Sequence, residues 1–464
     1  MVTPGDAARR VLHGRTDAAP LEMKMTHTQR MRRPPILCVA LIAGHVALAG
    51  AQGLPRARAE DVGLSTPELR KIDAQLQGWV DSGKFAGVIA VVARHGKLAY
   101  VAATGSLESS GRPIALDDVF RLYSMTKPIA STAVMQLVEA GKVRLDDPVS
   151  KFIPAFASTK VYASGPASNP VLVAPTRPVT IHDLLTHTSG LTYGAFSNTP
   201  VDSIYRRANM LDDRFTLAQF ADSIARLPLM FQPGTRWNYG LSIDVLGRVV
   251  EVASGMTFDA YLDSAIFRPL GMRTTSFHAT PAMAGHITRL FVRGPDRKLT
   301  AANPLLAEQF TDSGRMLSGG GGLLSTIPDY LRFTQMLLNG GELDGRRVLA
   351  RKTVALMMRN HIPGRLIPIF PGFPEPPGRN GFGYGGAVRV DSGSADMPGS
   401  AGTFRWSGYA STFFWIDPKA DLIAMLFTQY IPEPEIWAVD GQYQRLVYAA
   451  VRHRGVATAG VSSP

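Results

Sequence analysis

Residues 119–127 read VFRLYSMTK and place a serine three positions before a lysine, in the pattern Ser124-x-x-Lys127. The apolar residues that follow recur at helical spacing, and Gly141 fits the position just past a helix end. Ser124 is therefore expected at or near the start of a helix, with Lys127 one turn further along the same face.

This arrangement suits nucleophilic catalysis. A serine hydroxyl is a weak nucleophile until a neighbouring group takes its proton. A lysine beside it can accept that proton, or can stabilise a neighbouring phenolate by its charge. The start of a helix offers backbone N–H groups to a developing oxyanion. The motif alone is nevertheless short, and a serine at a helix start is more often a simple N-cap.

Further segments give the motif a context. Residues 141–148 read GKVRLDDP, residues 180–191 read TIHDLLTHTSGL, and residues 233–240 read PGTRWNYG. In this order and at these spacings, the chain resembles the serine β-lactamase-like superfamily from about residue 64 to residue 451. It looks most similar to the class C β-lactamases and the family VIII carboxylesterases. The resemblance implies an α/β (α+β) fold of the β-lactamase/D,D-peptidase type, with an antiparallel sheet flanked by helices.

The resemblance also implies roles for individual residues. Ser124 matches the acylated serine and Lys127 the lysine of its motif, while Tyr239 matches the tyrosine that acts as general base and general acid. The family's Lys-Thr-Gly element is matched by Trp406-Ser407-Gly408. The backbone N–H of the next residue, Tyr409, would then form an oxyanion hole with the N–H of Ser124. The alternative for Trp406 is a core aromatic of a hairpin.

Two departures from the family pattern concern the substrate. The asparagine two residues after the catalytic tyrosine is replaced by Leu241, and the lysine of Lys-Thr-Gly is replaced by Trp406. In members that process β-lactams, those groups hold the amide side chain and the carboxylate of the substrate. An apolar wall in their place favours an uncharged ester. We therefore expect a carboxylesterase that forms an acyl-enzyme on Ser124, with short acyl groups.

Other functions remain open on the same residues. A β-lactamase, a D,D-peptidase or a D-amino-acid amidase acting on cell-wall-like substrates would use the same acyl-enzyme, as would an acyltransferase. A non-catalytic binding module would be expected to lack the three catalytic residues, which are all present. No Gly-x-Ser-x-Gly motif occurs, so an α/β-hydrolase is not indicated. The glycine-rich run 318–322 lacks the Gly-Lys-Ser/Thr of a phosphate loop, and close packing is the expected reason for it. His187 is interpreted as a structural turn residue.

The composition restricts the partners. Of the 464 residues, 45% are hydrophobic and 19% charged, which is typical of a globular chain. The net charge is +12, but no dense basic block follows the first fifty residues, so nucleic-acid binding is not expected. The histidines form no His-Glu-x-x-His pattern, and no metal or cofactor is expected. The expected partner is a small-molecule ester, and the oligomeric state is open.

The N-terminal residues resemble a secretory leader. Three arginines at positions 30, 32 and 33 precede the apolar run 36–49, and small residues at 47–51 fit a cleavage site. The run is too short for a comfortable membrane span. We expect residues 1–51 to be a leader that directs export to the periplasm or the outside, with no stable membrane insertion after cleavage. The single cysteine, Cys38, lies in the run, so the mature chain would contain no disulfide and no thiol nucleophile.

Two hairpins at opposite ends of the chain indicate how the domains are organised. Runs rich in Val, Ile, Ala and Tyr cover 87–94 and 97–104, and a second pair covers 409–416 and 422–428. We expect one sheet domain from residues 52–123 and 301–464, a helical domain from 124–300, and the active site at their junction. A helix with Thr66 as its N-cap and another helix over 436–451 are also predicted, and so is a long loop over 362–386.

Overall fold

The computed structural model describes residues 53–452, except for 109, 211–213, 295, 303–309, 311–313, 368–379, 392–397 and 432–436. The predicted leader, its apolar run and Cys38 lie outside the described residues, so export stays a prediction. Among the helices that the structure describes, none combines the length and the apolar character needed to cross a bilayer.

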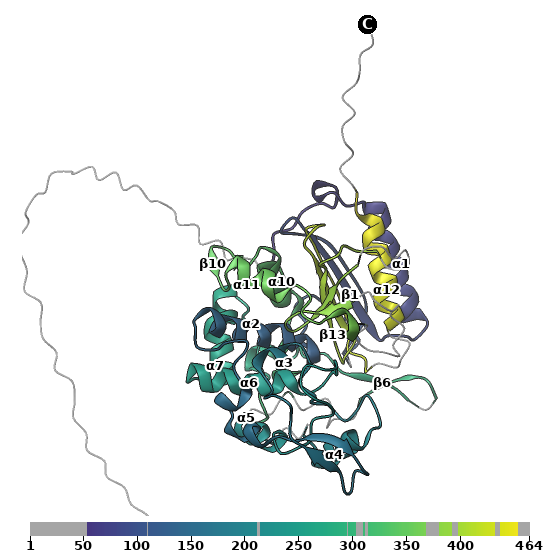
Figure 1. The fold of residues 1–464 in the computed structure, drawn as a ribbon. Helices are drawn as coiled ribbons and strands as arrows, with labels where there is room; N and C mark the ends of the chain where they lie inside the picture. Colours follow the sequence, from purple (N-terminus) through teal and green to yellow (C-terminus); the bar gives the residue numbers. More distant parts are fainter. Residues whose placement is uncertain are drawn as a thin grey trace, which may run out of the picture. The chain divides into compact units, whose positions relative to one another are not determined.

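One antiparallel sheet is built from both ends of the chain, as the two hairpins predicted (Figure 1). Its order is β11-β12-β13-β14-β15-β1-β2 in the described part of the chain. The strands are β1 (Gly87–Arg94), β2 (Lys97–Gly105), β11 (Asn380–Phe382), β12 (Ala387–Arg389), β13 (Phe404–Gly408), β14 (Thr412–Asp417) and β15 (Leu422–Phe427). The N-terminal hairpin therefore pairs directly with the C-terminal one.

Strand β1 lies inside the sheet because its sequence is apolar on both faces. It pairs with β15 on one side, with Ile89 opposite Phe427, and with β2 on the other. Alternate side chains of a strand point to opposite faces. Accordingly Ile89 and Val91 enter one hydrophobic core, while Val88 and Val92 enter another. A continuous apolar run is the pattern expected of a strand covered on both sides.

Helices cover the two faces of the sheet. On one face α1 (Thr66–Asp81) and α12 (Trp437–Ala450) lie side by side (Figure 1), and their apolar residues share a core with β1 and β15. On the other face α10 (Ile327–Leu338) packs Tyr330 against Phe414, with ring centroids 5.3 Å apart. This second core is continuous with the helices that carry the candidate site.

The middle of the chain is mostly helical, as predicted. Its described helices are α2 (Thr126–Glu139), α3 (Ile181–Leu185), α4 (Pro200–Ala208), α5 (Leu217–Ile224), α6 (Ser242–Ser254), α7 (Phe258–Leu262) and α8 (Arg268–Leu270), and α11 (Arg351–Met357) follows α10. Short hairpins join them: β4 (Val161–Ser164) with β5 (Val171–Val173), and β6 (Phe291–Arg293) with β7 (Leu299–Ala301). The division into a sheet domain and a helical domain stays a prediction.

Element boundaries differ from the sequence prediction at several places; strand β11, for example, lies within the predicted loop 362–386. The N-cap of α1 is Ser65, one residue before the expected Thr66. The predicted strand 409–416 begins only at Thr412, because residues 409–411 form the turn that joins β13 to β14. The Trp406-Ser407-Gly408 segment therefore lies within a strand, β13, which pairs with β14 along its whole length.

Candidate active site

Ser124 lies in a short 3-10 turn that leads into α2. Strand β3 (Phe120–Arg121) pairs with β8 (Leu324–Ser325), and the turn η2 (Tyr123–Met125) follows directly. Tyr123 has a φ of 43°, a left-handed value that is uncommon for a residue with a side chain. The turn presents the half-buried Ser124 just before the first residue of α2, where the N-terminal N–H groups of the helix provide positive potential.

Lys127 is one turn further along and fully buried. Its Nζ donates a hydrogen bond to Ser124 Oγ at 3.0 Å and another to the carbonyl oxygen of Gly320 at 2.6 Å. The same ammonium lies 4.7 Å from the ring centroid of Tyr239. Burial of a charge is costly unless polar partners compensate for lost water. Here the carbonyl, the hydroxyl and the aromatic face provide that compensation.

Tyr239 completes the group from a distant part of the sequence. Its hydroxyl donates to Ser124 Oγ at 2.7 Å. The structure therefore brings together Ser124, Lys127 and Tyr239, as the sequence predicted. Aromatic rings surround Tyr239 on several sides; their centroids lie 4.9 to 6.2 Å from its own, and they belong to His187, Tyr193, Trp406, Phe196 and Trp237.

The loop that carries Tyr239 is held by the His-Thr-Ser-Gly segment. The carbonyl oxygen of His187 accepts from Asn238 N at 2.9 Å, and His187 Nδ1 accepts from Gly240 N at 3.4 Å. One residue thus fixes the backbone on both sides of Tyr239. Burial, together with the nearby charge of Lys127, lowers the pKa of His187 well below its usual value. A neutral imidazole keeps Nδ1 available as an acceptor, which supports the structural interpretation of His187.

Asp244 and Gly320 form a support for Lys127 that the sequence analysis missed. Asp244, in the first turn of α6, accepts from Gly320 N at 3.0 Å and from the Ser318 hydroxyl. Burial raises the pKa of this carboxyl, and the charge of Lys127 opposes that shift. Gly320 in turn offers its carbonyl oxygen to Lys127. In the sequence, the glycine-rich run 318–322 was the available sign of this support, and close packing was the predicted reason for the run.

Gly320→Ala is expected to lower the activity at least tenfold and the free energy of unfolding by about 1–3 kcal/mol. A Cβ at position 320 would lie well under 3.0 Å from the Asp244 carboxylate, so either that carboxylate or the backbone that offers its carbonyl to Lys127 must move. Gly321→Ala is the matched control, because its Cβ would meet its nearest neighbour at an ordinary 3.6 Å. Ester turnover and urea unfolding of both variants test this, and equal effects of the two substitutions would contradict it.

Strand β13 borders the site on the side of Tyr239. The Trp406 ring lies 5.4 Å from the Tyr239 ring and 5.2 Å from the Phe382 ring, and the residue is 8% exposed. A Cβ on Gly408 would collide with the carbonyl oxygen of Leu122, so β13 passes tightly against the segment that leads into Ser124. Trp406 thus packs as a core aromatic and also contacts the candidate catalytic tyrosine. Ser407 lies between these two residues and is half-buried.

Tyr409 lies just after β13 and beside the nucleophile turn. Its ring is 50% exposed and meets the Tyr123 ring edge-on, with centroids 5.8 Å apart. Tyr409, whose backbone N–H is the proposed oxyanion donor, therefore lies next to the turn that contains Ser124. The role of the Ser124 and Tyr409 N–H groups as an oxyanion hole stays a prediction.

Leu241 was expected to line the substrate site, but the structure places it elsewhere. The side chain is 1% exposed and belongs to the main hydrophobic core at the start of α6. The position two residues after Tyr239 is therefore part of the interior. Of the two departures from the family pattern, Trp406 has a ring contact with Tyr239, whereas Leu241 is buried in the core.

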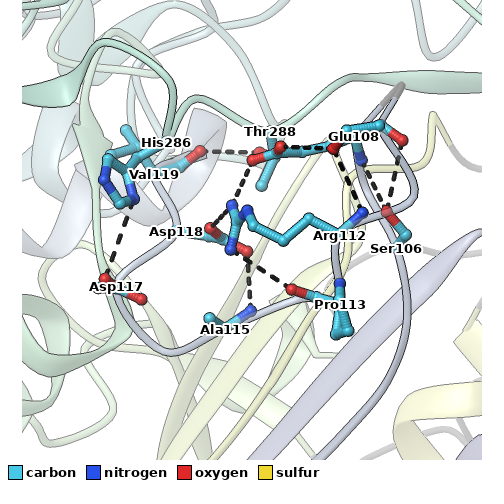
Figure 2. Close-up of polar contacts among 11 residues, drawn as sticks. Ser106, Glu108, Arg112, Pro113, Ala115, Asp117, Asp118, Val119, His286 and Thr288 are labelled. Atoms are coloured by element: carbon cyan, nitrogen blue, oxygen red, sulfur yellow. Dashed lines mark hydrogen bonds and ion pairs between the residues drawn. The ribbon is translucent and has the colours of Figure 1, made fainter.

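One group of side chains in the described residues has the spacing of metal ligands. Atoms of Asp117, Asp118 and His286 lie within 4.8 Å of one another. Figure 2 shows that Arg112 reaches into this group and pairs with both Asp118 and Glu108. Asp118 also accepts from the backbone N–H of Ala115 at 2.8 Å. The buried carboxylate is thus already paired with a guanidinium, which makes the group an ion-pair network.

In this fold a buried lysine and a tyrosine hydroxyl both lie within hydrogen-bond distance of the reactive atom of a serine, Ser124 Oγ. This arrangement defines a serine hydrolase of the β-lactamase-like fold. The chain belongs to the beta-lactamase family, whose model matches residues 70–449.

Known relatives include enzymes that act on esters. The chain is 33% identical to esterase EstB of Burkholderia gladioli over 376 residues, covering 77% of this chain and 89% of EstB. It is 29% identical to the lovastatin esterase of Penicillium rubens, covering 82% and 97%. A solved structure described as EstCE1, a hydrolase with promiscuous acyltransferase activity, superposes with a TM-score of 0.70 at 26% identity, covering 82% and 99%. These relatives support a serine hydrolase that acts on esters.

Proposed function

We propose that this protein is a carboxylesterase that cleaves its substrate through an acyl-enzyme on Ser124. The observation that carries the proposal is the position of Ser124 Oγ, within hydrogen-bond distance of both Lys127 Nζ at 3.0 Å and Tyr239 Oη at 2.7 Å. A hydroxyl placed between two such groups can lose its proton as it attacks.

The proposed reaction has two halves. In the reactive form Tyr239 is a phenolate beside the Lys127 ammonium. Ser124 Oγ attacks the ester carbonyl carbon while its proton passes to that phenolate oxygen, which becomes the phenol. The carbonyl oxygen becomes an oxyanion, which faces the N–H groups of Ser124 and Tyr409. The C–O bond to the alcohol then breaks, and Tyr239 returns the proton to the departing alkoxide. A water molecule repeats the sequence on the acyl-enzyme and releases the acid.

Trp406 is the reason to prefer an ester over a β-lactam as the proposed substrate. Its indole lies beside the Tyr239 ring. At this sequence position the family resemblance implies a lysine in β-lactam-processing members, and tryptophan offers no cation for a substrate carboxylate. The esterase relatives support the same substrate class. We propose short acyl groups as the first substrates and regard β-lactam or D-alanyl peptide hydrolysis as the competing activity. EstCE1, which is described as having promiscuous acyltransferase activity, supports acyl transfer to alcohols as a side reaction.

A substrate panel on the purified mature protein tests this proposal. We expect kcat/KM for p-nitrophenyl acetate and butyrate to exceed that for a penicillin or a cephalosporin by at least about 100-fold, a difference of about 2.7 kcal/mol in transition-state binding. A fluorophosphonate probe should modify Ser124, as read by peptide mass spectrometry. A higher kcat/KM for the β-lactam would replace the esterase assignment with a β-lactamase, and absence of turnover and labelling would favour a binding module.

A further inference from the structure

The reaction chemistry fixes where the alcohol part of an ester lies in this site. The departing alkoxide must receive its proton from the Tyr239 hydroxyl, because that group lies 2.7 Å from Ser124 Oγ and can reach both atoms. The alcohol part is therefore bound on the Tyr239 side of Ser124. The carbonyl oxygen points toward the proposed oxyanion hole, on the Tyr409 side.

Among the aromatic rings around Tyr239, Phe196 is the most exposed. The ring of Tyr239 is in contact with several aromatic side chains, and most of this cluster is shielded: Tyr239 is 9% exposed and Trp406 8%. Phe196 differs, because it is 53% exposed while its ring lies 5.6 Å from the Tyr239 ring. A large apolar side chain that is half in water beside a reacting group is a surface on which a ligand can be bound.

The loop that presents Phe196 is anchored at both ends to α4. Asp202, which is fully buried, accepts from Thr192 Oγ1 at 2.8 Å and from the Ser197 hydroxyl. Arg206 donates to the carbonyl oxygen of Gly194 at 2.6 Å. These bonds hold the segment between residues 192 and 197 on the helix, and the ring of Phe196 rests edge-on against Tyr193. The exposed ring is thus part of a fixed surface.

We propose that Phe196 is the specificity-determining residue for the alcohol part of the substrate, and that it favours esters of bulky apolar or aromatic alcohols. The inference rests on the proposed esterase function. Contact with an apolar alcohol removes the ring from water and strengthens binding through the transition state, whereas a methyl or ethyl group is too short to cover it.

The same surface serves alcohols that attack the acyl-enzyme. Deacylation is the reverse of acylation with a different oxygen nucleophile, so an acceptor alcohol occupies the position that the leaving alcohol vacated. Its hydroxyl proton passes to Tyr239 and then to Ser124 Oγ, as the new C–O bond forms and the bond between Oγ and the acyl carbon breaks. An apolar alcohol held by Phe196 therefore competes with water, and the protein acts as an acyltransferase toward such acceptors.

Two ratios measured on the full mature protein test the inference. The first is kcat/KM for benzyl acetate divided by that for ethyl acetate, which share one acyl group. The second is the yield of benzyl acetate divided by the yield of free acetate, with vinyl acetate as the acyl donor and benzyl alcohol as the acceptor. We expect both ratios to fall about tenfold in Phe196→Ala and to recover largely in Phe196→Leu, which restores apolar surface. The ratio of kcat/KM for ethyl butyrate to kcat/KM for ethyl acetate, which share one alcohol, should stay unchanged.

Leu172→Ala is the matched variant, because Leu172 is another large apolar side chain that is partly exposed, at 39%, and it lies in the β4-β5 hairpin. It should leave both alcohol ratios unchanged. Equal losses of kcat/KM for benzyl acetate and ethyl acetate in Phe196→Ala, with an unchanged yield ratio of benzyl acetate to acetate, would overturn the inference. The esterase assignment would remain intact. Ester turnover that does not depend on Ser124 would instead overturn the proposed function itself.

Discussion

Ser124→Ala is expected to lower kcat for p-nitrophenyl acetate by about 10⁴-fold or more, to near the rate of the uncatalysed reaction. The substitution removes only the Oγ atom, to which Lys127 and Tyr239 both donate. Lys127 keeps its bond to the Gly320 carbonyl oxygen, so the charge remains compensated and the fold should persist. Stopped-flow or plate-reader hydrolysis, with a thermal melt of the same sample, measures both effects.

Ser131→Ala provides the matched control for that substitution. Ser131 lies in the same helix, α2, is fully buried, and its hydroxyl has no hydrogen-bond partner among the described residues. We expect its activity to stay within about twofold of the wild type, because neither reacting atoms nor their supports change. A Ser124→Ala variant that is folded and retains a tenth of the wild-type activity would show that another nucleophile operates.

Tyr239→Phe is expected to reduce kcat by about 10²–10⁴-fold with little change in KM. The phenyl ring keeps its contacts with His187, Phe196 and Trp406, so the aromatic cluster and the Phe196 surface remain. Only the hydroxyl that lies 2.7 Å from Ser124 Oγ is lost. Without it the attacking hydroxyl keeps its proton and the leaving alkoxide is not protonated, so both halves of the reaction slow.

Tyr205→Phe tests whether loss of any buried hydroxyl would have the same effect. Tyr205 is buried in α4, and its hydroxyl has no partner among the described residues. Its kcat should stay close to that of the wild type. A fall in kcat of less than about tenfold for a folded Tyr239→Phe variant would leave Lys127 as the group that exchanges the proton with Ser124.

Local sequence patterns were sufficient to predict much of the fold. The apolar run of β1 and its hairpin with the run 97–104 are properties of neighbouring residues, and both appear where predicted. The Ser-x-x-Lys spacing is equally local, since one helical turn joins Ser124 to Lys127. Tyr239 could be added only through the family resemblance, because no pattern within the chain relates residues so far apart.

The remainder of the site depends on tertiary contacts that no local pattern encodes. Asp244 meets Gly320 because α6 packs beside the glycine run, and the sequence indicates only that the run is tightly packed. Leu241 was expected to face the substrate by analogy with an asparagine, yet an apolar side chain at the start of α6 is buried. Phe196 carries no motif, and only its exposed position beside Tyr239 distinguishes it.

The position of β1 in the sheet has a consequence for biosynthesis. Ile89 emerges from the ribosome early, while its partner Phe427 is made roughly 340 residues later, at about 5–20 residues per second. For roughly 20 to 70 seconds the N-terminal hairpin carries an apolar strand with one unpaired edge, the kind of surface that recruits other chains. The pairing of β1 with β15 can therefore be completed only after the last hairpin has left the ribosome, and until then the open edge of β1 is exposed to association with other chains.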